Sequence, residues 1–190
     1  AGAAALLANC RPECDLARLW QASLILRHWD LGRDREYYDD PRTRALLKPE
    51  LQWEIEGSFT LSANDVNDAG AARGDWYRAL TDLFDTYDLL VLPSAQVFPF
   101  SKDLHWPKSI AGKAMDTYHR WMEVVIGPTL AGLPAVSLPA GFDPQGRPMG
   151  MQFIGRHGAA QGVLDFALAY TAATDFLGIR PGTTGRRRGF

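Results

Sequence analysis

The sequence predicts an α/β fold, in which helices cover the strands of a sheet, from three observations. Stretches with apolar residues every three to four positions, above all 62–87, predict amphipathic helices. Short apolar runs that end at proline, 88–93 and 135–138, are too short for helices and predict buried strands. Helical and strand patterns follow one another along the chain, which is typical of layered α/β domains.

The first half of the chain is predicted to be helical. Residues 14–29 carry apolar side chains near helical spacing. A break is expected at 39–41, because a residue before proline avoids the helical conformation. A short helix is expected over 49–55, with proline in its first turn. Ser62 is the predicted N-cap of the longest helix, with Asp65 three residues later.

In the second half, a loop over 94–113 follows the first strand and is long enough to form the rim of a pocket. Helical spacing returns over 115–130 and again over 159–177. The apolar stretch 149–154 predicts a second buried strand next to the strand at 135–138. We therefore expect the sheet and its covering helices to come mostly from this half.

Turn chemistry marks the boundaries of these strands. Gly132 can adopt a left-handed conformation and Pro134 cannot continue a helix, so the preceding helix is expected to end here. The strand at 135–138 lies between two prolines and has little room to either side. Residues 143–146 carry proline and glycine in the order of a tight turn, which predicts a hairpin.

Length and composition are those of an ordinary globular protein. A chain of 190 residues can form one domain with a sizeable core, and 46% hydrophobic and 22% charged residues are unremarkable values. We expect a single structural unit over 1–190, with a flexible tail over 179–190 that includes the arginines at 186–188. The apolar start at 1–8 is too short to span a membrane and lacks the basic region of a signal peptide.

Charge and cysteine content exclude several classes of partner and ligand. A net charge of −2 provides no basic field, so no nucleic acid partner is expected. Cys10 and Cys14 could share one helix face as metal ligands, but no second pair or nearby histidine accompanies them. Two free thiols in a reducing compartment are the preferred interpretation, which predicts a cytoplasmic protein. No metal, no cofactor and no membrane association is predicted.

Residues 126–155, IGPTLAGLPAVSLPAGFDPQGRPMGMQFIG, closely resemble the C-terminal half of the amidase signature family of amide hydrolases. The resemblance extends over 46–178 and includes the YDLLVLPS segment. It implies the C-terminal part of the amidase signature fold, with the strands of a mixed sheet covered by helices. Because the first residue is alanine, we expect the chain to be a piece of a longer protein.

The resemblance implies that the parent protein hydrolyses a carboxamide to a carboxylate and ammonia or an amine. The Ser–cisSer–Lys triad of the family lies upstream, so no catalytic residue is expected in this chain, and the chain alone is expected to be inactive. Substitutes within the chain are weak. Ser109 and Lys113 are one residue further apart than in a Ser-x-x-Lys motif, and Ser137 lacks the flanking glycines of a nucleophile elbow.

What the chain can supply is one wall of the substrate pocket. By the resemblance, the helix before the TLAG segment lines the cavity that receives the substrate. The matching positions, which are aromatic or aliphatic, are Tyr118, Trp121, Met122, Val125 and Ile126. Such a face suits an apolar pocket, but it suits core packing equally well. The expected partners are the missing N-terminal portion of the protein and a small-molecule amide, and a homo-oligomer is left open.

Two other interpretations remain open. The parent could be the relative of the family that acts as the A-type subunit of an amidotransferase in tRNA-linked amide transfer. Alternatively, the chain could be a non-catalytic domain that is derived from the amidase fold and used for binding or assembly. An isolated domain of this second kind would unfold cooperatively, whereas a fragment would expose the apolar surface that its missing half covers.

Overall fold

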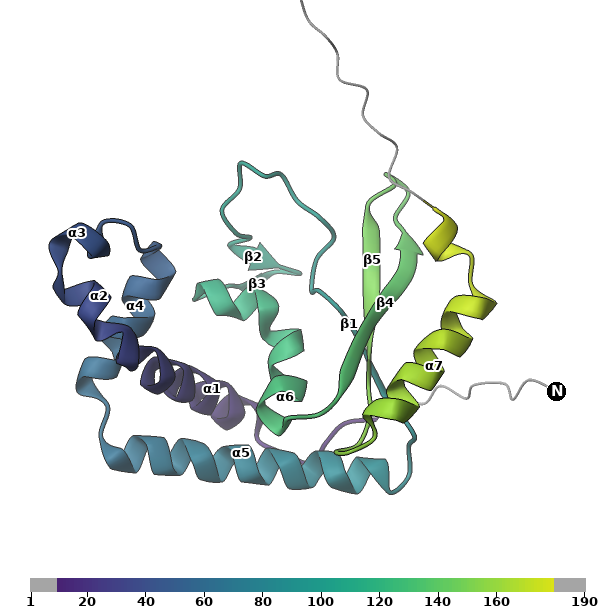
Figure 1. Ribbon diagram of the computed structural model, residues 1–190, viewed down its shortest axis with the longest axis horizontal. Helices are drawn as coiled ribbons and strands as arrows, with labels where there is room; N and C mark the ends of the chain where they lie inside the picture. Colours follow the sequence, from purple (N-terminus) through teal and green to yellow (C-terminus); the bar gives the residue numbers. More distant parts are fainter. Residues whose placement is uncertain (1–9, 180–190) are drawn as a thin grey trace, which may run out of the picture. The chain divides into compact units, whose positions relative to one another are not determined.

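The structure, a computed structural model, describes residues 10–179 (Figure 1). Their contacts group into two compact units, which we describe separately. The first comprises residues 10–88 and Ile126–Gly132, and the second comprises Leu89–Val125 and residues 133–179. The single domain expected over the whole chain stays a prediction. The apolar start at 1–8 and the tail beyond residue 179 lie outside the described residues.

The first unit is built from helices, as the spacing of its apolar residues predicts. Its α-helices are α1 (Leu16–Leu31), α2 (Arg35–Asp39), α3 (Pro41–Arg44), α4 (Pro49–Gly57) and α5 (Ala63–Phe84), with 3₁₀ turns at Gly32–Asp34 and Ser58–Thr60. The predicted break falls at Asp40, which is extended and whose carboxylate accepts a hydrogen bond from the backbone N–H of Arg42. Asp40 therefore separates α2 from α3 and caps the latter.

The start of α5 has the capping box that the sequence predicts. The Ser62 hydroxyl accepts a hydrogen bond from the backbone N–H of Asp65 at 3.2 Å, and the Asp65 carboxylate accepts one from the backbone N–H of Ser62 at 2.8 Å. These two bonds satisfy N–H groups that have no partner within the helix. The buried stripe of the helix follows the predicted period and comprises Ala69, Ala72, Trp76, Ala79, Leu80 and Phe84.

Small residues bring α1 and α5 together, and the two helices lie side by side in Figure 1. Ala22 of α1 packs against Ala69 and Ala72 of α5, and each of these side chains is at most 3% exposed. Alanine at a helix contact lets two helix axes approach closely. Ile25 and Leu26 pack around this contact and complete the core of the first unit.

The segment Ile126–Gly132 also packs on α5. Trp76 donates a hydrogen bond from Nε1 to the Gly127 carbonyl at 2.8 Å, and Arg73 donates one from Nε to the Leu130 carbonyl at 2.6 Å. A methyl group on Gly127 would lie 2.9 Å from the Trp76 ring, so only glycine fits beneath this ring without a shift. Gly132 has φ of +65°, as predicted for the end of this helix.

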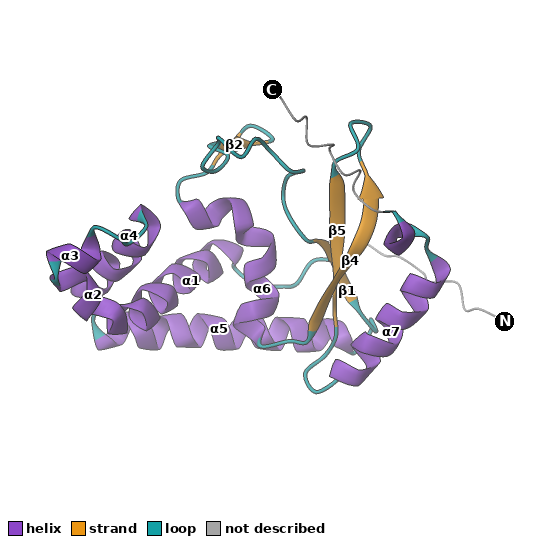
Figure 2. Ribbon diagram, turned by 45° about the horizontal axis from the view of Figure 1, so that its top comes forward, coloured by secondary structure: helices purple, strands orange, loops and turns teal. Residues whose placement is uncertain are grey.

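The second unit contains the sheet. Its elements are β1 (Leu90–Pro93), β2 (Ser109–Ile110), β3 (Lys113–Ala114), a 3₁₀ turn (Tyr118–Met122), the start of α6 (Glu123–Ala131), β4 (Ala135–Phe142), β5 (Pro148–Ile154), α7 (Ala160–Ala173) and a 3₁₀ turn (Phe176–Gly178). The boundary between the two units falls within α6. The sheet has the order β1-β5-β4, and β2 and β3 form a separate hairpin (Figure 2).

Both pairings of the described sheet are antiparallel, so it does not include the parallel pairing that a mixed sheet contains. Successive side chains of a strand point to opposite faces. On one face, Leu138 and Phe153 pack with Ala167 of α7. Partly buried hydrophobic side chains pack around this cluster, namely Val91, Val136, Met151, Phe166 and Tyr170. The Tyr170 hydroxyl donates a hydrogen bond to the Pro139 carbonyl at 2.7 Å and attaches α7 to β4. The opposite face carries the polar side chains of Ser137 and Gln152.

β4 continues past the proline that was expected to limit it. Pro139 is tolerated because β4 is the outer strand of the described sheet and because the register shifts between Pro139 and Gly141. Gly141 has φ of +112°, a conformation that favours glycine. The predicted turn follows, in which Asp143 accepts hydrogen bonds from the backbone N–H groups of Gln145 and Arg147.

The continuous helix expected over 115–130 is wrong in its first part. The backbone N–H of Met115 donates to the Lys108 carbonyl at 2.9 Å and extends the pairing of the β2–β3 hairpin. Thr117 is also extended, with φ of −133° and ψ of 162°. A 3₁₀ turn then leads into α6 at Glu123. Backbone pairing with the hairpin therefore overrides the helical spacing of the side chains.

Candidate functional site

The second unit contains a hollow of about 500 Å³ at the end of the sheet where β1 ends and β5 begins. Its walls come from the loop after β1, from the 3₁₀ turn before α6 and from β4 and β5. Three aromatic side chains, Phe98, Phe100 and Trp121, line it. Phe100 meets Trp121 edge to face, with ring centroids 5.6 Å apart. We call this cavity the aromatic hollow.

Two serine hydroxyls meet in the aromatic hollow. Ser94 Oγ lies 2.6 Å from Ser137 Oγ, and the backbone N–H of Ser94 donates to the Gly150 carbonyl at 2.8 Å. A methyl group on Gly150 would lie 2.9 Å from Ser94 Oγ and 3.2 Å from Ser137 Oγ. The absence of a side chain at Gly150 therefore leaves the space that the hydroxyl pair occupies.

Two glutamines hold the wall of the aromatic hollow to the first turn of α6. Gln152 donates hydrogen bonds from Nε2 to the carbonyls of Pro93 at 3.0 Å and Val124 at 3.1 Å. Gln96 accepts one from the backbone N–H of Val124 at 3.0 Å, a group that has no partner within the helix. Pro128 lacks the N–H that would otherwise donate a hydrogen bond to the Val124 carbonyl, so the Gln152 side chain supplies this hydrogen bond instead.

The five residues that the sequence predicts as pocket wall do not all line the aromatic hollow. Trp121 lines the aromatic hollow, and the Tyr118 ring lies 6.1 Å from it within a cluster that includes Trp106. Met122 and Val125 are half-buried in the second unit, and Ile126 belongs to the first unit. A role in substrate binding stays a prediction for all of these residues.

Sequence reasoning missed the contribution of Ser94 and Ser137. Ser137 was considered only as a nucleophile without the flanking glycines of an elbow, and it lies in β4. Its contact with Ser94 joins residues 43 positions apart. Ser94 follows β1 and Ser137 lies in β4, and β5 runs between these two strands. Only the register of β1 and of β4 on β5 therefore brings the two serines together. No local spacing in the sequence encodes such a pairing.

The weak Ser–Lys candidate does not form a catalytic pair. Ser109 pairs with Ala114 and Ile110 pairs with Lys113 in the β2–β3 hairpin, so Ser109 and Lys113 project from opposite faces. Lys113 lies 3.7 Å from the Glu123 carboxylate instead. Within residues 10–179, no lysine donates a hydrogen bond to a serine hydroxyl, so the described part of the chain shows no Ser–Lys pair.

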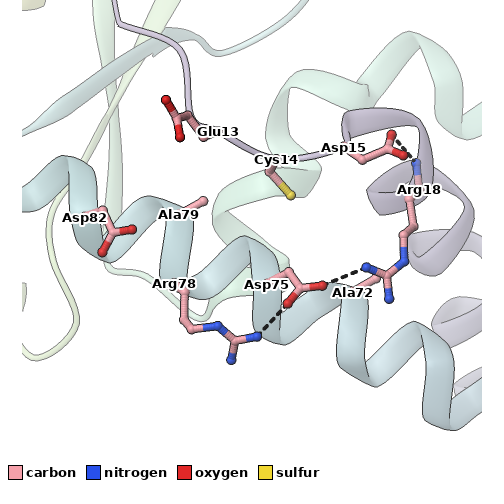
Figure 3. Close-up of a pocket in the computed structure, with 9 residues that line it drawn as sticks. All are labelled: Glu13, Cys14, Asp15, Arg18, Ala72, Asp75, Arg78, Ala79 and Asp82. Atoms are coloured by element: carbon pink, nitrogen blue, oxygen red, sulfur yellow. Dashed lines mark hydrogen bonds and ion pairs between the residues drawn. The ribbon is translucent and has the colours of Figure 1, made fainter.

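A second cavity, of about 460 Å³, lies in the first unit between the start of α1 and the middle of α5 (Figure 3). Arg18 and Arg78 both donate to the Asp75 carboxylate, at 2.7 Å and 2.5 Å. Burial raises the pKa of the Cys14 thiol, and the nearby carboxylates of Asp75 and Asp15 raise this pKa further. A protonated thiol is a poor nucleophile, and Cys14 precedes α1 rather than sharing a helix face with Cys10.

The ion pairs of this second cavity make the stability of the fold depend on pH. Hydrogen bonds from Arg18 and from Arg78 hold the pKa of Asp75 below its usual value. A lowered pKa stabilises the fold above the unfolded-state value of about 4, and this contribution is lost as the pH falls through the folded-state value. The Asp75→Asn variant is therefore expected to be less stable than the wild type at about pH 7, and the difference should shrink below about pH 4.

Urea unfolding of both proteins at several pH values measures this difference. Asp75 is 44% exposed, so solvent screens the ion pairs and the expected effect is small. A stability difference that stays constant from about pH 7 to about pH 2.5 would show that the charge of Asp75 does not stabilise the fold.

Two further findings concern the described residues. Among residues 10–179, no three or more His, Cys, Asp or Glu side chains are arranged to hold a metal ion. No helix in the described part of the chain combines the length and the apolar character that crossing a membrane requires.

Comparison with solved structures shows a known fold. A bacterial aryl acylamidase of the amidase signature enzymes matches with a TM-score of 0.70 at 23% identity, over 86% of this chain and 34% of that chain. A 6-aminohexanoate cyclic dimer hydrolase matches with a TM-score of 0.68 at 18% identity, over 88% of this chain and 37% of that chain. The expected α/β fold of the amidase signature type is confirmed.

Comparison of sequences shows the family. Residues 21–164 match the family described as Amidase. The A-type subunit of glutamyl-tRNA(Gln) amidotransferase from Lacticaseibacillus casei (strain BL23) is 35% identical over 184 residues, 93% of this chain and 36% of that protein. Its counterpart from Rhizorhabdus wittichii is 34% identical over 180 residues, 90% of this chain and 34% of that protein. The chain thus spans about a third of the length of these relatives, and it belongs to the amidase signature family.

Proposed function

We propose that the whole protein hydrolyses the C–N bond of a carboxamide and that this chain supplies part of its substrate pocket. Membership of the amidase signature family supports the reaction class. In the proposed reaction, a serine oxygen attacks the amide carbonyl, the C–N bond breaks, and the nitrogen leaves with a proton as ammonia or an amine. Water then cleaves the acyl-enzyme ester to give the carboxylate. The Ser–cisSer–Lys triad for these steps lies outside this chain.

The aromatic hollow is the observation that carries the proposed role of this chain. It is concave, its walls are mostly apolar, and it contains two hydroxyl groups, the combination that small-molecule sites typically show. Trp121 forms part of its wall, and the Tyr118 ring contacts Trp121 edge to face. We propose that these two residues, with Met122 and Val125 of the same unit, belong to the pocket that receives the amide substrate. The missing N-terminal portion would complete the pocket, in the cytoplasm.

A specific observation also favours a second candidate. The curated relatives at 34–35% identity carry the name of the A-type subunit of glutamyl-tRNA(Gln) amidotransferase. The whole protein would then release ammonia from an amide donor and pass it to a partner protein. The two candidates share the amide-cleaving step and differ in the substrate and in the dependence on a partner.

One set of assays separates these candidates. We expect the full-length protein to release aniline from acetanilides or ammonia from small primary amides, and the purified 190-residue chain to release neither. Release of ammonia from glutamine that requires a partner protein would favour the amidotransferase instead. Turnover by the 190-residue chain that survives repurification would contradict a triad outside it. No turnover by the full-length protein with any of these substrates would favour a non-catalytic binding domain.

A further inference from the structure

The hydroxyl pair of Ser94 and Ser137 is not needed to hold the fold together. Ser137 is exposed and Ser94 is half-buried, and the sheet around them is already fixed by backbone pairing. Gln152, which pairs with Ser137 in the sheet, makes the buried hydrogen bonds of this face. The hydroxyl pair instead faces the aromatic hollow, which both side chains line.

Counting protons shows what the pair can offer to a ligand. Each hydroxyl has one proton, and the 2.6 Å contact between the two oxygens uses one of the two. The hydroxyl that accepts this hydrogen bond keeps its own proton, for which the described residues contain no hydrogen-bond acceptor. A hydroxyl that already accepts a hydrogen bond is a better donor, because chains of hydrogen bonds polarise one another. The pair therefore presents one activated donor to the aromatic hollow.

The residues around this donor indicate which kind of ligand fits the aromatic hollow. Phe98, Phe100 and Trp121 line the same hollow, and aromatic side chains pack well against a planar ring. Gly150 leaves the oxygens uncovered, since a methyl group there would crowd both of them. The described residues that line the hollow include no lysine or arginine. Arg147 lies beside it, 5.7 Å from the centroid of the Phe98 ring, but its guanidinium is already paired with the Asp143 carboxylate at 2.6 Å, so an anionic group has no unpaired cation here.

We propose that Ser94 and Ser137 form a specificity-determining pair that hydrogen-bonds an acceptor atom on an aromatic ring of the substrate. The substrate class is then an aryl amide whose ring carries an uncharged acceptor, such as an ether oxygen. This inference rests on the proposed amide-hydrolase function for the identity of the substrate. The binding preference of the hollow itself can be tested without turnover.

The experiment compares two ring probes that lack an amide and a hydroxyl, 4-methylanisole and 4-ethyltoluene. They have similar size, and only the first carries an ether acceptor. Dissociation constants are measured by NMR titration of the full-length protein. We expect the methoxy probe to bind about 3- to 10-fold more tightly, the range of one neutral hydrogen bond. The Ser94→Ala/Ser137→Ala double variant should lose this preference without weaker binding of the ethyl probe.

Two controls make the outcome specific. Ser109→Ala removes an exposed hydroxyl from the β2–β3 hairpin of the same unit and should leave the preference unchanged. Trp121→Leu removes part of the aromatic wall and should weaken the binding of both probes. Equal binding of the two probes to the wild type, or no binding of either, would overturn the proposal even if the double variant does not fold.

Measuring probe binding and amide cleavage on the same full-length protein distinguishes this proposal from the proposed function. A probe preference in a protein that cleaves no amide supports the hydroxyl pair and counts against the hydrolase. Amide cleavage with equal binding of the two probes supports the hydrolase and overturns the hydroxyl pair. A preference that persists in the double variant also overturns it, because the acceptor must then be recognised elsewhere.

Discussion

Replacing Trp76 by alanine is expected to lower the free energy of unfolding by about 3–5 kcal/mol. The Trp76 side chain is 8% exposed and lies in the buried stripe of α5. Its removal leaves a cavity and takes away the hydrogen bond to the Gly127 carbonyl. The closely packed Gly127 cannot fill this cavity, because glycine has no side chain to move into it. Urea unfolding followed by far-ultraviolet circular dichroism measures the change.

The matched control is Trp29→Ala. Trp29 is 60% exposed and lies in the last turn of α1. Its removal should change the free energy of unfolding by less than about 1 kcal/mol. Equal losses in the two variants would mean that the packing of Ile126–Gly132 on α5 does not stabilise the first unit. A third variant, Trp76→Phe, keeps most of the ring volume and should lose about 1–2 kcal/mol with the hydrogen bond.

Replacing Gln152 by methionine is expected to lower the free energy of unfolding by about 2–4 kcal/mol. Gln152 is 6% exposed and donates to the carbonyls of Pro93 and Val124. Methionine has nearly the same size but no donor, so the substitution isolates the hydrogen bonds from the packing. The Val124 carbonyl is then left without the donor that Pro128 cannot supply, and desolvated acceptors of this kind are costly.

Gln161→Met is the matched control for this variant. Gln161 is exposed on α7, where it donates to Asp165 at 2.8 Å. Its loss should cost no more than about 0.5 kcal/mol, as is usual for surface substitutions. If Gln152→Met were as stable as this control, Gln152 would not hold the wall of the aromatic hollow to α6.

Features that short-range chemistry determines could be predicted from the sequence. The capping box of Ser62 and Asp65, the left-handed Gly132 and the hairpin turn at 143–146 each depend on a few adjacent residues. The buried stripe of α5 also followed from its spacing, because a helix presents every third or fourth residue to one side. Local propensity and pattern agree at these places with the structure around them.

Features that depend on contacts between distant segments could not be predicted. The helical spacing over 115–122 was overridden because Met115 pairs with Lys108 beside the hairpin. β4 passes through Pro139 because it is the outer strand of the described sheet, a position that a single sequence does not reveal. The meeting of Ser94 with Ser137 requires the order of three strands to be known.

The candidate site was therefore predicted only in part. Trp121 was selected from the family resemblance and does line the aromatic hollow, but Phe98 and Phe100 were recognised only as members of a long loop. The importance of Gln152 was hidden because its partners are backbone carbonyls, which carry no signal in the sequence. Pro128 was a clue to it, since a proline inside a helix leaves one carbonyl in need of another donor.

The proposed role of this chain is to supply pocket wall to an amidase whose triad lies elsewhere in the same protein. Reading the coding DNA in frame upstream of Ala1 tests this role most directly. We predict a lysine-bearing segment followed by a Gly-Ser-Ser-Gly-type run in the same reading frame. A start codon immediately before Ala1, with no such run encoded upstream, would contradict it and leave the aromatic hollow as the binding site of a non-catalytic domain.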